Sequence, residues 1–174
     1  MDLESIMTEH GLGSAAMSPC GIHVDEEGVW YYQGVEITRE NIVQLFYENL
    51  HITSEGAFYV EWRGQRCALD SADTPFVIVD VQRTDPSKDG SEAILLSLRH
   101  LRVSEKLDPG TLYVGKDNVL YCRIRGGAFP ARFSRPAYYR LAEWIEQDQD
   151  SGEFQLVLGG NRYLVACAEE QNEG

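Results

Sequence analysis

The sequence predicts an α+β fold of two small related β-β-α-β-β units in tandem, each with a mostly antiparallel sheet packed on one helix. Two observations predict this fold. Short runs of alternating apolar and polar residues are separated by turns that contain glycine, a pattern typical of β-hairpins. In addition, the stretch Gly28–Phe46, an aromatic strand followed by a helix, recurs in altered form roughly 96 residues later, which indicates an internal repeat.

The first unit is predicted to span residues 20–84 and to begin with a hairpin that turns at residues 25–28. Gly28 supplies the positive φ that this turn requires. A helix of roughly thirteen residues then starts at Thr38, whose hydroxyl can accept an N–H of the first turn. Apolar residues at helical spacing predict the buried face of this helix. They are Ile42, Leu45, Phe46 and Leu50.

The rest of the first unit is predicted as a second hairpin around Gly64 and one further strand. The run Phe76–Val81 is apolar except at Asp80, which is typical of a strand buried on both faces. We expect this strand to close the first unit.

The second unit, which is predicted to be roll-like, spans residues 85–168. Its two hairpins are expected to turn at residues 116–118 and 159–161. Residues 94–103 alternate well enough to predict a strand, and a helix is the alternative that their composition leaves open.

Matched positions at one spacing support the repeat. Thr38 corresponds to Ser134, which predicts a second helix from Ser134 to about Gln147. Leu45 corresponds to Leu141 on the buried faces of the two helices. The alternative is that unrelated α+β units share the same order of hairpin, helix and hairpin.

Composition and charge limit the classes of partner. The 174 residues carry a formal net charge of −13, which argues against general affinity for nucleic acid or anionic lipid. Residues 1–85 hold fifteen acidic against four basic residues, so the second half is close to neutral and is the better place for an anionic ligand. No apolar run is long enough for a membrane span. Residues 1–19 and 169–174 show no sustained period and are predicted to be flexible.

The cysteines Cys20, Cys67, Cys122 and Cys167 lie far apart and form no Cys-x-x-Cys pair. This spacing argues against a structural zinc site. We expect four buried thiols in a reducing compartment, and therefore a cytoplasmic protein. The sequence also lacks the motifs of nucleophilic catalysis and of phosphate-binding loops, so no catalytic residue, cofactor or metal is predicted.

Two sets of residues are candidates for a binding site. Trp30 and Tyr32 lie on an aromatic strand and either pack in the core or form the rim of a ligand site. Between Arg99 and Arg140, nine basic residues stand against three acidic ones. Four arginines of this run are predicted to bind an anion. They are Arg123, Arg125, Arg132 and Arg135. For Arg135, the interpretation that we favour over an anionic ligand is an ion pair with a carboxylate of the acidic first unit.

Three segments resemble the bacterial family known as domain of unknown function 1285. They are Ile22–Arg39, Ala72–Val81 and Arg123–Leu141. The resemblance covers roughly residues 20–166. It implies two small α+β domains of related shape and a role in ligand binding or signalling, and it implies no reaction.

The residues and the resemblance together predict a non-enzymatic, cytoplasmic ligand- or protein-binding module, with signalling as one such role. The alternative is an enzyme of unknown class that acts on an anionic small molecule near Arg132 and Arg135. The expected partner is an anionic small molecule or a protein. The oligomeric state is left open, and a homodimer is compatible with the sequence.

Overall fold

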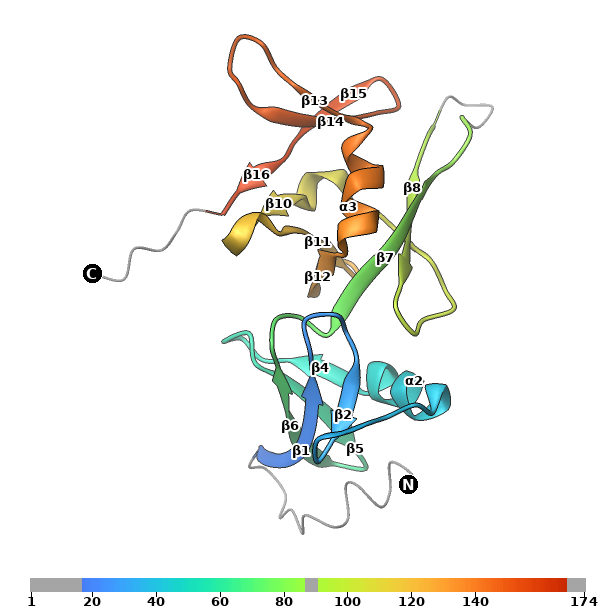
Figure 1. Cartoon of the computed structure of the whole chain (residues 1–174), viewed down its shortest axis with the longest axis vertical. Helices are drawn as coiled ribbons and strands as arrows, with labels where there is room; N and C mark the ends of the chain where they lie inside the picture. The colour runs from blue at the N-terminus through green and yellow to red at the C-terminus, as the bar shows by residue number, and fades with distance from the viewer. Residues whose placement is uncertain (1–16, 87–90, 169–174) are drawn as a thin grey trace, which may run out of the picture. The chain divides into compact units, whose positions relative to one another are not determined.

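A computed structural model describes residues 17–86 and 91–168 of the chain (Figure 1). The fold is mostly β with two α-helices in these residues, which agrees with the predicted α+β class. The chain divides into two compact units between Pro75 and Phe76, and each unit is described by itself. Among the described residues, no helix is both long and apolar enough to cross a membrane.

The first unit consists of one six-stranded sheet and the helix α2 (Glu40–Glu48). Its strand order is β3-β2-β1-β6-β5-β4, and the central pair β1 and β6 is parallel. The strands are β1 (Ser18–Val24), β2 (Trp30–Tyr32), β3 (Val35–Glu36), β4 (Leu50–Ile52), β5 (Phe58–Trp62) and β6 (Gln65–Ser71). Both predicted hairpins are confirmed, and β1 begins inside the segment that was predicted to be flexible. The remainder of that segment and the predicted flexible tail at 169–174 lie outside the described residues.

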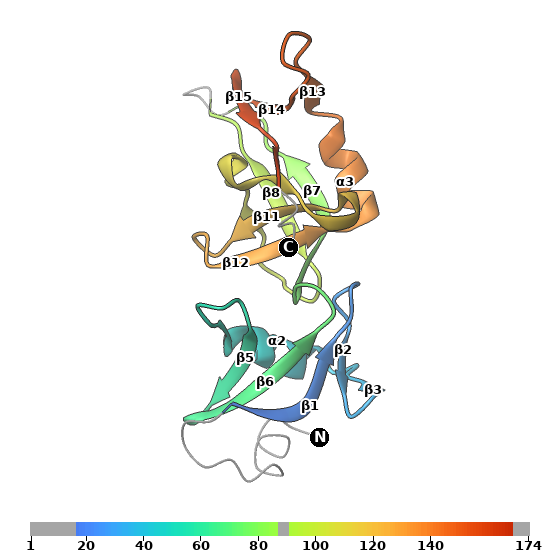
Figure 2. The same ribbon diagram turned by 90° about the vertical axis from the view of Figure 1, so that its left-hand side faces the viewer.

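The helix α2 covers one face of this sheet, as Figure 2 shows with the helix behind the strands. Trp30 on β2 stacks on Phe46 with ring centroids 5.2 Å apart and meets Tyr47 edge-on at 5.1 Å. The Tyr47 hydroxyl donates to the Pro75 carbonyl at 2.7 Å, which satisfies its polar end inside the core. Aromatic packing therefore fixes the helix on the sheet.

The start of α2 differs from the prediction. The N-cap is Arg39, with no side-chain cap, and Thr38 lies outside the helix. The helix ends after nine residues because the chain turns directly into β4, whose Leu50 pairs with Val60 of β5. Leu45 is only half-buried, since Phe46 and Tyr47 face the sheet instead.

The expectation of four free thiols is wrong. Cys20 on β1 and Cys67 on β6 form a disulfide across the parallel pair, with Cα atoms 5.6 Å apart. Cys122 is a buried free thiol, as expected, and Cys167 is exposed. The spacing of cysteines along the chain does not reveal the bond because the two strands are neighbours only through the sheet.

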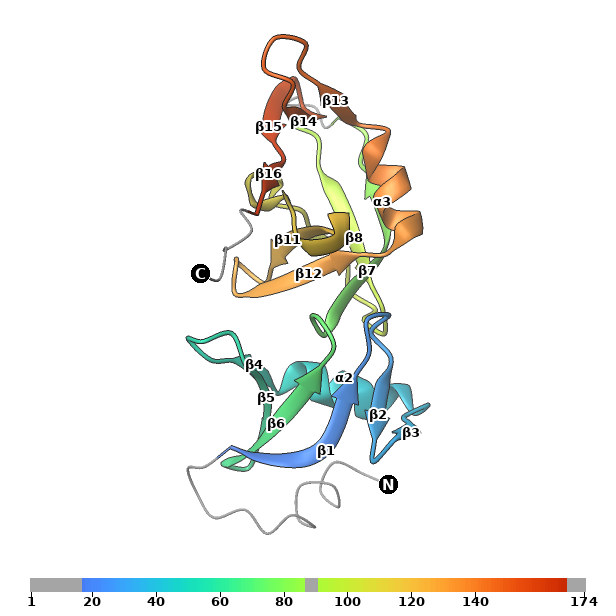
Figure 3. The same cartoon turned by 60° about the vertical axis from the view of Figure 1, so that its left-hand side comes forward.

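The second unit contains a seven-stranded sheet, a separate three-stranded sheet and the helix α3 (Arg135–Ala142) (Figure 3). The orders are β16-β10-β11-β12-β7-β8-β9 and β13-β14-β15. The strands are β7 (Phe76–Arg83), β8 (Ile94–Leu98), β9 (Glu105–Lys106), β10 (Tyr113–Val114), β11 (Leu120–Ile124), β12 (Phe129–Phe133), β13 (Ile145–Gln147), β14 (Phe154–Leu158), β15 (Asn161–Leu164) and β16 (Ala166–Cys167), with 3-10 turns η1 (Pro109–Thr111) and η2 (Lys116–Asn118). Both predicted hairpins of this unit are confirmed.

Strand β7 corrects the predicted boundary between 84 and 85. Its burial on both faces is largely as expected, but it pairs with β12 and β8 of the seven-stranded sheet and so belongs to the second unit. The apolar run predicts a buried strand without indicating which sheet contains it. Residues 94–98 form the strand β8, so the first half of the segment 94–103 is a strand and not a helix.

The cap of α3 is confirmed, because the Ser134 hydroxyl accepts from the Ala137 amide at 3.4 Å. The helix is shorter than predicted. It stops at Ala142 because Ile145–Gln147 leaves the helical path and pairs with β14. Ala137 and Leu141 are buried, and Arg140 forms an ion pair with Asp80 of β7, beside which the helix runs.

Four strands of each unit agree in order and in register. In the first unit β3, β2, β1 and β6 are adjacent in that order, and in the second unit β12, β11, β10 and β16 are adjacent in that order. One row of cross-strand partners in the first unit is Glu36, Tyr31, His23 and Asp70. The corresponding row in the second unit is Arg132, Tyr121, Tyr113 and Ala166.

Candidate functional site

Aromatic and basic side chains share one face of the seven-stranded sheet. Tyr113 on β10 lies directly opposite Tyr121 on β11, and Tyr121 lies opposite Arg132 on β12. The two tyrosine rings stack, with centroids 5.2 Å apart and an interplanar angle of 14°. We name this surface the Tyr–Arg face and define it by Tyr113, Tyr121, Arg123 and Arg132.

Strand alternation places these side chains away from the core. Leu120, Cys122 and Ile124 of β11 are buried, so Tyr121 and Arg123 between them point to the opposite face. Tyr113, Tyr121 and Arg132 are half-buried and Arg123 is exposed. The alternation that builds the core therefore also builds the Tyr–Arg face.

Gly115 leaves the space that the Tyr121 ring of the tyrosine pair occupies. A Cβ atom at this position would lie 2.8 Å from the Tyr121 ring, closer than a van der Waals contact allows. The amide of Gly115 donates to the Val119 carbonyl at 2.8 Å, which closes the hairpin between β10 and β11. The glycine thus lets one ring lie directly over the backbone of the neighbouring strand.

The same row continues beyond Arg132 onto β7 and the end of β8. Arg132 pairs with Val77, and the amide of Arg99 donates to the Val77 carbonyl at 2.9 Å. Val77 is buried, so the accessible part of the row ends at Arg132.

Arg125 lies apart from the other predicted arginines. Its guanidinium lies over the rings of Phe76 and Phe129, at 4.9 and 5.8 Å, and these rings belong to the opposite, apolar face. Its Nε is 3.8 Å from a Glu105 oxygen, and its amide donates to the same carboxylate at 2.8 Å. Arg125 has a positive φ of 51°, which turns its side chain away from the position that plain alternation predicts.

Arg135 is the first residue of α3 and is exposed. Arg123 makes one long contact, from Nη1 to the Gly127 carbonyl at 3.4 Å. The structure thus brings Arg123 and Arg132 to one sheet face, directs Arg125 to the other face and leaves Arg135 on a helix.

Trp30 and Tyr32 lie in the core of the first unit. Their exposed fractions are 0% and 6%. Of the two interpretations that the sequence allowed, core packing describes both residues, because α2 covers the face of the sheet on which they lie.

The corresponding face of the first unit carries the opposite charge. We name Glu36, Tyr31, His23 and Asp70 the acidic row. His23 Nδ1 is 2.8 Å from Asp70 Oδ2, and the two side chains are 40% and 80% exposed. The Tyr31 hydroxyl donates to Asp25 at 3.1 Å, and this hydrogen bond raises the pKa of Tyr31.

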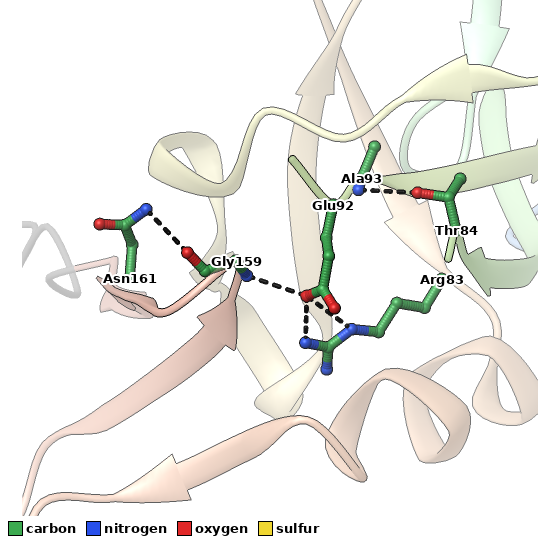
Figure 4. A network of polar contacts seen from close by, with 6 residues as sticks. All are labelled: Arg83, Thr84, Glu92, Ala93, Gly159 and Asn161. Atoms are coloured by element: carbon green, nitrogen blue, oxygen red, sulfur yellow. Dashed lines mark hydrogen bonds and ion pairs between the residues drawn. The ribbon is translucent and has the colours of Figure 1, made fainter. Parts of the chain in front are cut away.

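A further polar network joins separate parts of the second unit (Figure 4). Arg83 on β7 forms an ion pair with Glu92, and the Gly159 amide in the β14–β15 turn donates to the same carboxylate at 3.0 Å. The Arg83 hydrogen bond and the Gly159 amide hold the pKa of Glu92 below its usual range. The Arg83 guanidinium also lies 5.9 Å from the Trp144 ring centroid. These contacts are structural, because they connect one hairpin to the turn of another.

The Tyr–Arg face can bind but has little means to catalyse. Its members offer guanidinium groups, aromatic faces and phenolic hydroxyls, and a carboxylate or imidazole is not among them. In the described residues, no three His, Cys, Asp or Glu side chains gather in a way that could hold a metal ion. Guanidinium groups bind carboxylates and phosphates with two parallel hydrogen bonds, and aromatic faces accept planar groups.

Sequence reasoning missed the tyrosine pair. The signal for Tyr121 was present in the alternation of residues 120–124, which sets Tyr121 and Arg123 on the same side. The signal for Tyr113 required the register of the β10–β11 hairpin.

No protein-family model matches the sequence, and no curated protein matches it. Among solved structures, a DUF1285 family protein from Silicibacter pomeroyi DSS-3 is similar with a TM-score of 0.71 and 23% sequence identity, over 95% of this chain and 90% of that chain. A DUF1285 family protein from Shewanella baltica OS155 is similar with a TM-score of 0.59 and 18% identity, over 71% of this chain and 91% of that chain. The resemblance to domain of unknown function 1285 is thus confirmed at the level of the fold.

Proposed function

We propose, starting from the fold that the chain shares with DUF1285 family proteins, that this protein is a non-enzymatic binding module. Its Tyr–Arg face takes an anionic ligand or an acidic segment of a protein. One observation carries the proposal: the stacked pair Tyr113 and Tyr121 continues directly into Arg132 on the next strand. A role in signalling is part of the same proposal, whereas the Cys20–Cys67 disulfide removes the argument for a reducing compartment from which a cytoplasmic location was expected.

The chemistry of the row supports binding of an anion. Neighbouring strands are spaced by about 4.8 Å, so Tyr113, Tyr121 and Arg132 present two ring faces and one guanidinium over roughly 10 Å. Arg123 is the next residue of β11 on the same face as Tyr121. It pairs with Pro130, whereas Tyr121 pairs with Arg132, so Arg123 lies beside this row and not in it. Two cations on one face can together hold a carboxylate or phosphate.

The enzyme alternative near Arg132 and Arg135 is less well supported. A general acid or base has to lie within hydrogen-bond reach of the reacting group. The Tyr–Arg face supplies donors but no carboxylate or imidazole of its own, and Arg135 lies on α3 rather than on the sheet.

We also propose that the two units contain a tandem repeat in which strands precede and follow one helix, β1–β3, α2 and β4–β6 in the first unit and β10–β12, α3 and β13–β15 in the second. The agreement of strand order and of cross-strand partners supports this proposal. The pair Leu156 and Tyr163 in the second unit also corresponds to the pair Val60 and Cys67 in the first unit. The sequence offset between the two repeats changes by one residue at the helix, where Arg39 and Ser134 are the equivalent N-caps.

The proposed function can be tested by calorimetric titration with three probes: citrate, inorganic phosphate and a pentaglutamate peptide. We expect at least one probe to bind the wild type. Arg132→Ala should weaken that binding by roughly ten-fold or more, because a hydrogen-bonded charge pair is lost. Tyr121→Leu should also weaken it.

Arg162→Ala is the matched control. Arg162 is an exposed arginine of the same unit that pairs with Glu146 on the three-stranded sheet. It should leave binding unchanged. Absence of binding by all three probes, or equal loss in Arg132→Ala and Arg162→Ala, would overturn the proposal.

A further inference from the structure

The geometry points to self-association of the chain from head to tail, in which the acidic row of one copy binds the Tyr–Arg face of another. This inference rests on the proposed function, since it names the partner of the Tyr–Arg face. The partner is a second copy of this chain, and the chemistry that recognises it is a row of carboxylates flanking two aromatic rings.

The two surfaces match in spacing because each is a row of side chains across neighbouring paired strands. The acidic row crosses β3, β2, β1 and β6, and the Tyr–Arg face crosses the corresponding strands β12, β11 and β10. Successive members of both rows are therefore separated by the same interstrand distance of about 4.8 Å. Two faces with equal spacing can align several side-chain pairs at once.

The two surfaces also match in chemistry. Each has two neighbouring rings at its centre: Tyr31 and His23, with centroids 6.0 Å apart, and Tyr121 and Tyr113, with centroids 5.2 Å apart. In the acidic row a carboxylate stands at each end, Glu36 and Asp70, and both are exposed. In the Tyr–Arg face Arg132 takes the position of Glu36.

The net charge of −13 opposes contact between copies at long range, so the local attraction has to act at short distance. At an ionic strength of about 0.15 M the Debye length is about 8 Å, which screens the repulsion between distant charges more than the contact between facing side chains. Association is therefore expected to be measurable near that ionic strength.

The contact joins unlike surfaces, because the acidic row and the Tyr–Arg face belong to different units of the chain. Each copy therefore offers one surface of each kind. Two copies can exchange both contacts in a closed dimer, and further copies can extend an open chain.

Two charge-reversal variants test the two surfaces independently. Glu36→Arg disables the acidic row and keeps the Tyr–Arg face, and Arg132→Glu does the opposite. In sedimentation equilibrium near 0.15 M salt, the wild type should associate as concentration rises. Each variant alone should associate at least ten-fold more weakly. An equal mixture should associate about as strongly as the wild type, because Arg132 of one variant meets Glu36 of the other and the two reversed side chains pair at the opposite junction.

A matched control and the double variant complete the test. Glu153→Arg makes the same charge change at an exposed residue beside the start of β14 and should associate as the wild type does. Glu36→Arg combined with Arg132→Glu should regain self-association. A wild type that stays monomeric, a mixture that forms no dimer, or single variants that associate like Glu153→Arg would each overturn the inference.

The same variants distinguish this inference from the proposed function. Glu36 lies outside the Tyr–Arg face, so Glu36→Arg should bind citrate or pentaglutamate as the wild type does. Anion binding that depends on Arg132 in a wild type that remains monomeric would remove the self-association and leave the proposed function standing.

Discussion

Glu92 is a partly buried carboxylate that joins separate segments of the second unit. It accepts from the Gly159 amide at 3.0 Å and pairs with Arg83, so it holds the β14–β15 turn against β7 (Figure 4). Because these donors lower its pKa in the folded state, the stability that it contributes is present above the ordinary carboxyl pKa of 4.5 and is lost as pH falls through the lowered folded-state value.

We therefore expect Glu92→Gln to lower the melting temperature at pH 7, and the gap between variant and wild type to close as the pH is lowered below about 4.5. Melting curves by circular dichroism across this pH range measure the effect. Glu146→Gln, which affects a surface pair with Arg162, is the control and should change little at any pH. A gap that stays constant or widens in acid would contradict the assigned role.

Single residues also show where sequence reasoning reached its limit in the candidate site. The local alternation of β11 predicts that Tyr121 and Arg123 share a face, and the structure places them so. Arg125 would follow the same rule, but its positive φ at the start of the turn sends the guanidinium over Phe76 and Phe129. A charge pattern along the chain predicts the number of cations in a region, whereas backbone conformation decides which of them meet.

At the scale of elements, the two helix starts provide a matched comparison. The Ser134 hydroxyl accepts from the Ala137 amide, whereas α2 begins at Arg39 with no side-chain cap and Thr38 lies before it. We expect Ser134→Ala to reduce the free energy of unfolding by about 1 kcal/mol. Thr38→Ala should change it by less than about 0.5 kcal/mol. Urea unfolding of the two variants tests this difference, and equal losses would show that Ser134 acts as no more than a surface residue.

Hairpins were predictable and helix ends were not, for one physical reason. A hairpin is specified by neighbouring residues, such as Arg63 and Gly64, which both adopt positive φ in the turn between β5 and β6. The ends of α2 and α3 are set instead by strands that follow them, because β4 pairs with β5 and β13 pairs with β14. The apolar spacing continues past each helix and gives no sign of this pairing.

At the scale of the whole molecule, the contacts that the sequence failed to predict are those between distant segments. The parallel pairs β1–β6 and β10–β16, and the pairing of β7 with β12, each join strands far apart in the chain. An apolar strand such as β7 fits the centre of either sheet, so its composition cannot assign it. The boundary at Pro75 and the bond between Cys20 and Cys67 are both consequences of these distant pairings.

The Cys20–Cys67 bond leads to a prediction about the first unit. It closes a sequence separation of 47 residues across the parallel pair β1–β6. The chain-entropy model gives a stabilisation of about 4 kcal/mol for a loop of this length. We expect a reductant to lower the melting temperature of the wild type and to speed hydrogen exchange in β1 and β6, which the bond joins directly.

The two remaining cysteines supply the control for this prediction. Burial raises the pKa of the Cys122 thiol to about 12, so Cys122 stays protonated and unreactive in the folded protein, and Cys167 is exposed on β16 of the seven-stranded sheet, a different sheet from that of β1 and β6. A Cys20→Ala, Cys67→Ala double variant should therefore be insensitive to reductant, while Cys122→Ala should respond as the wild type does. Equal response of the double variant and the wild type, or four free thiols found by mass spectrometry in protein purified without reductant, would show that the bond does not stabilise the first unit.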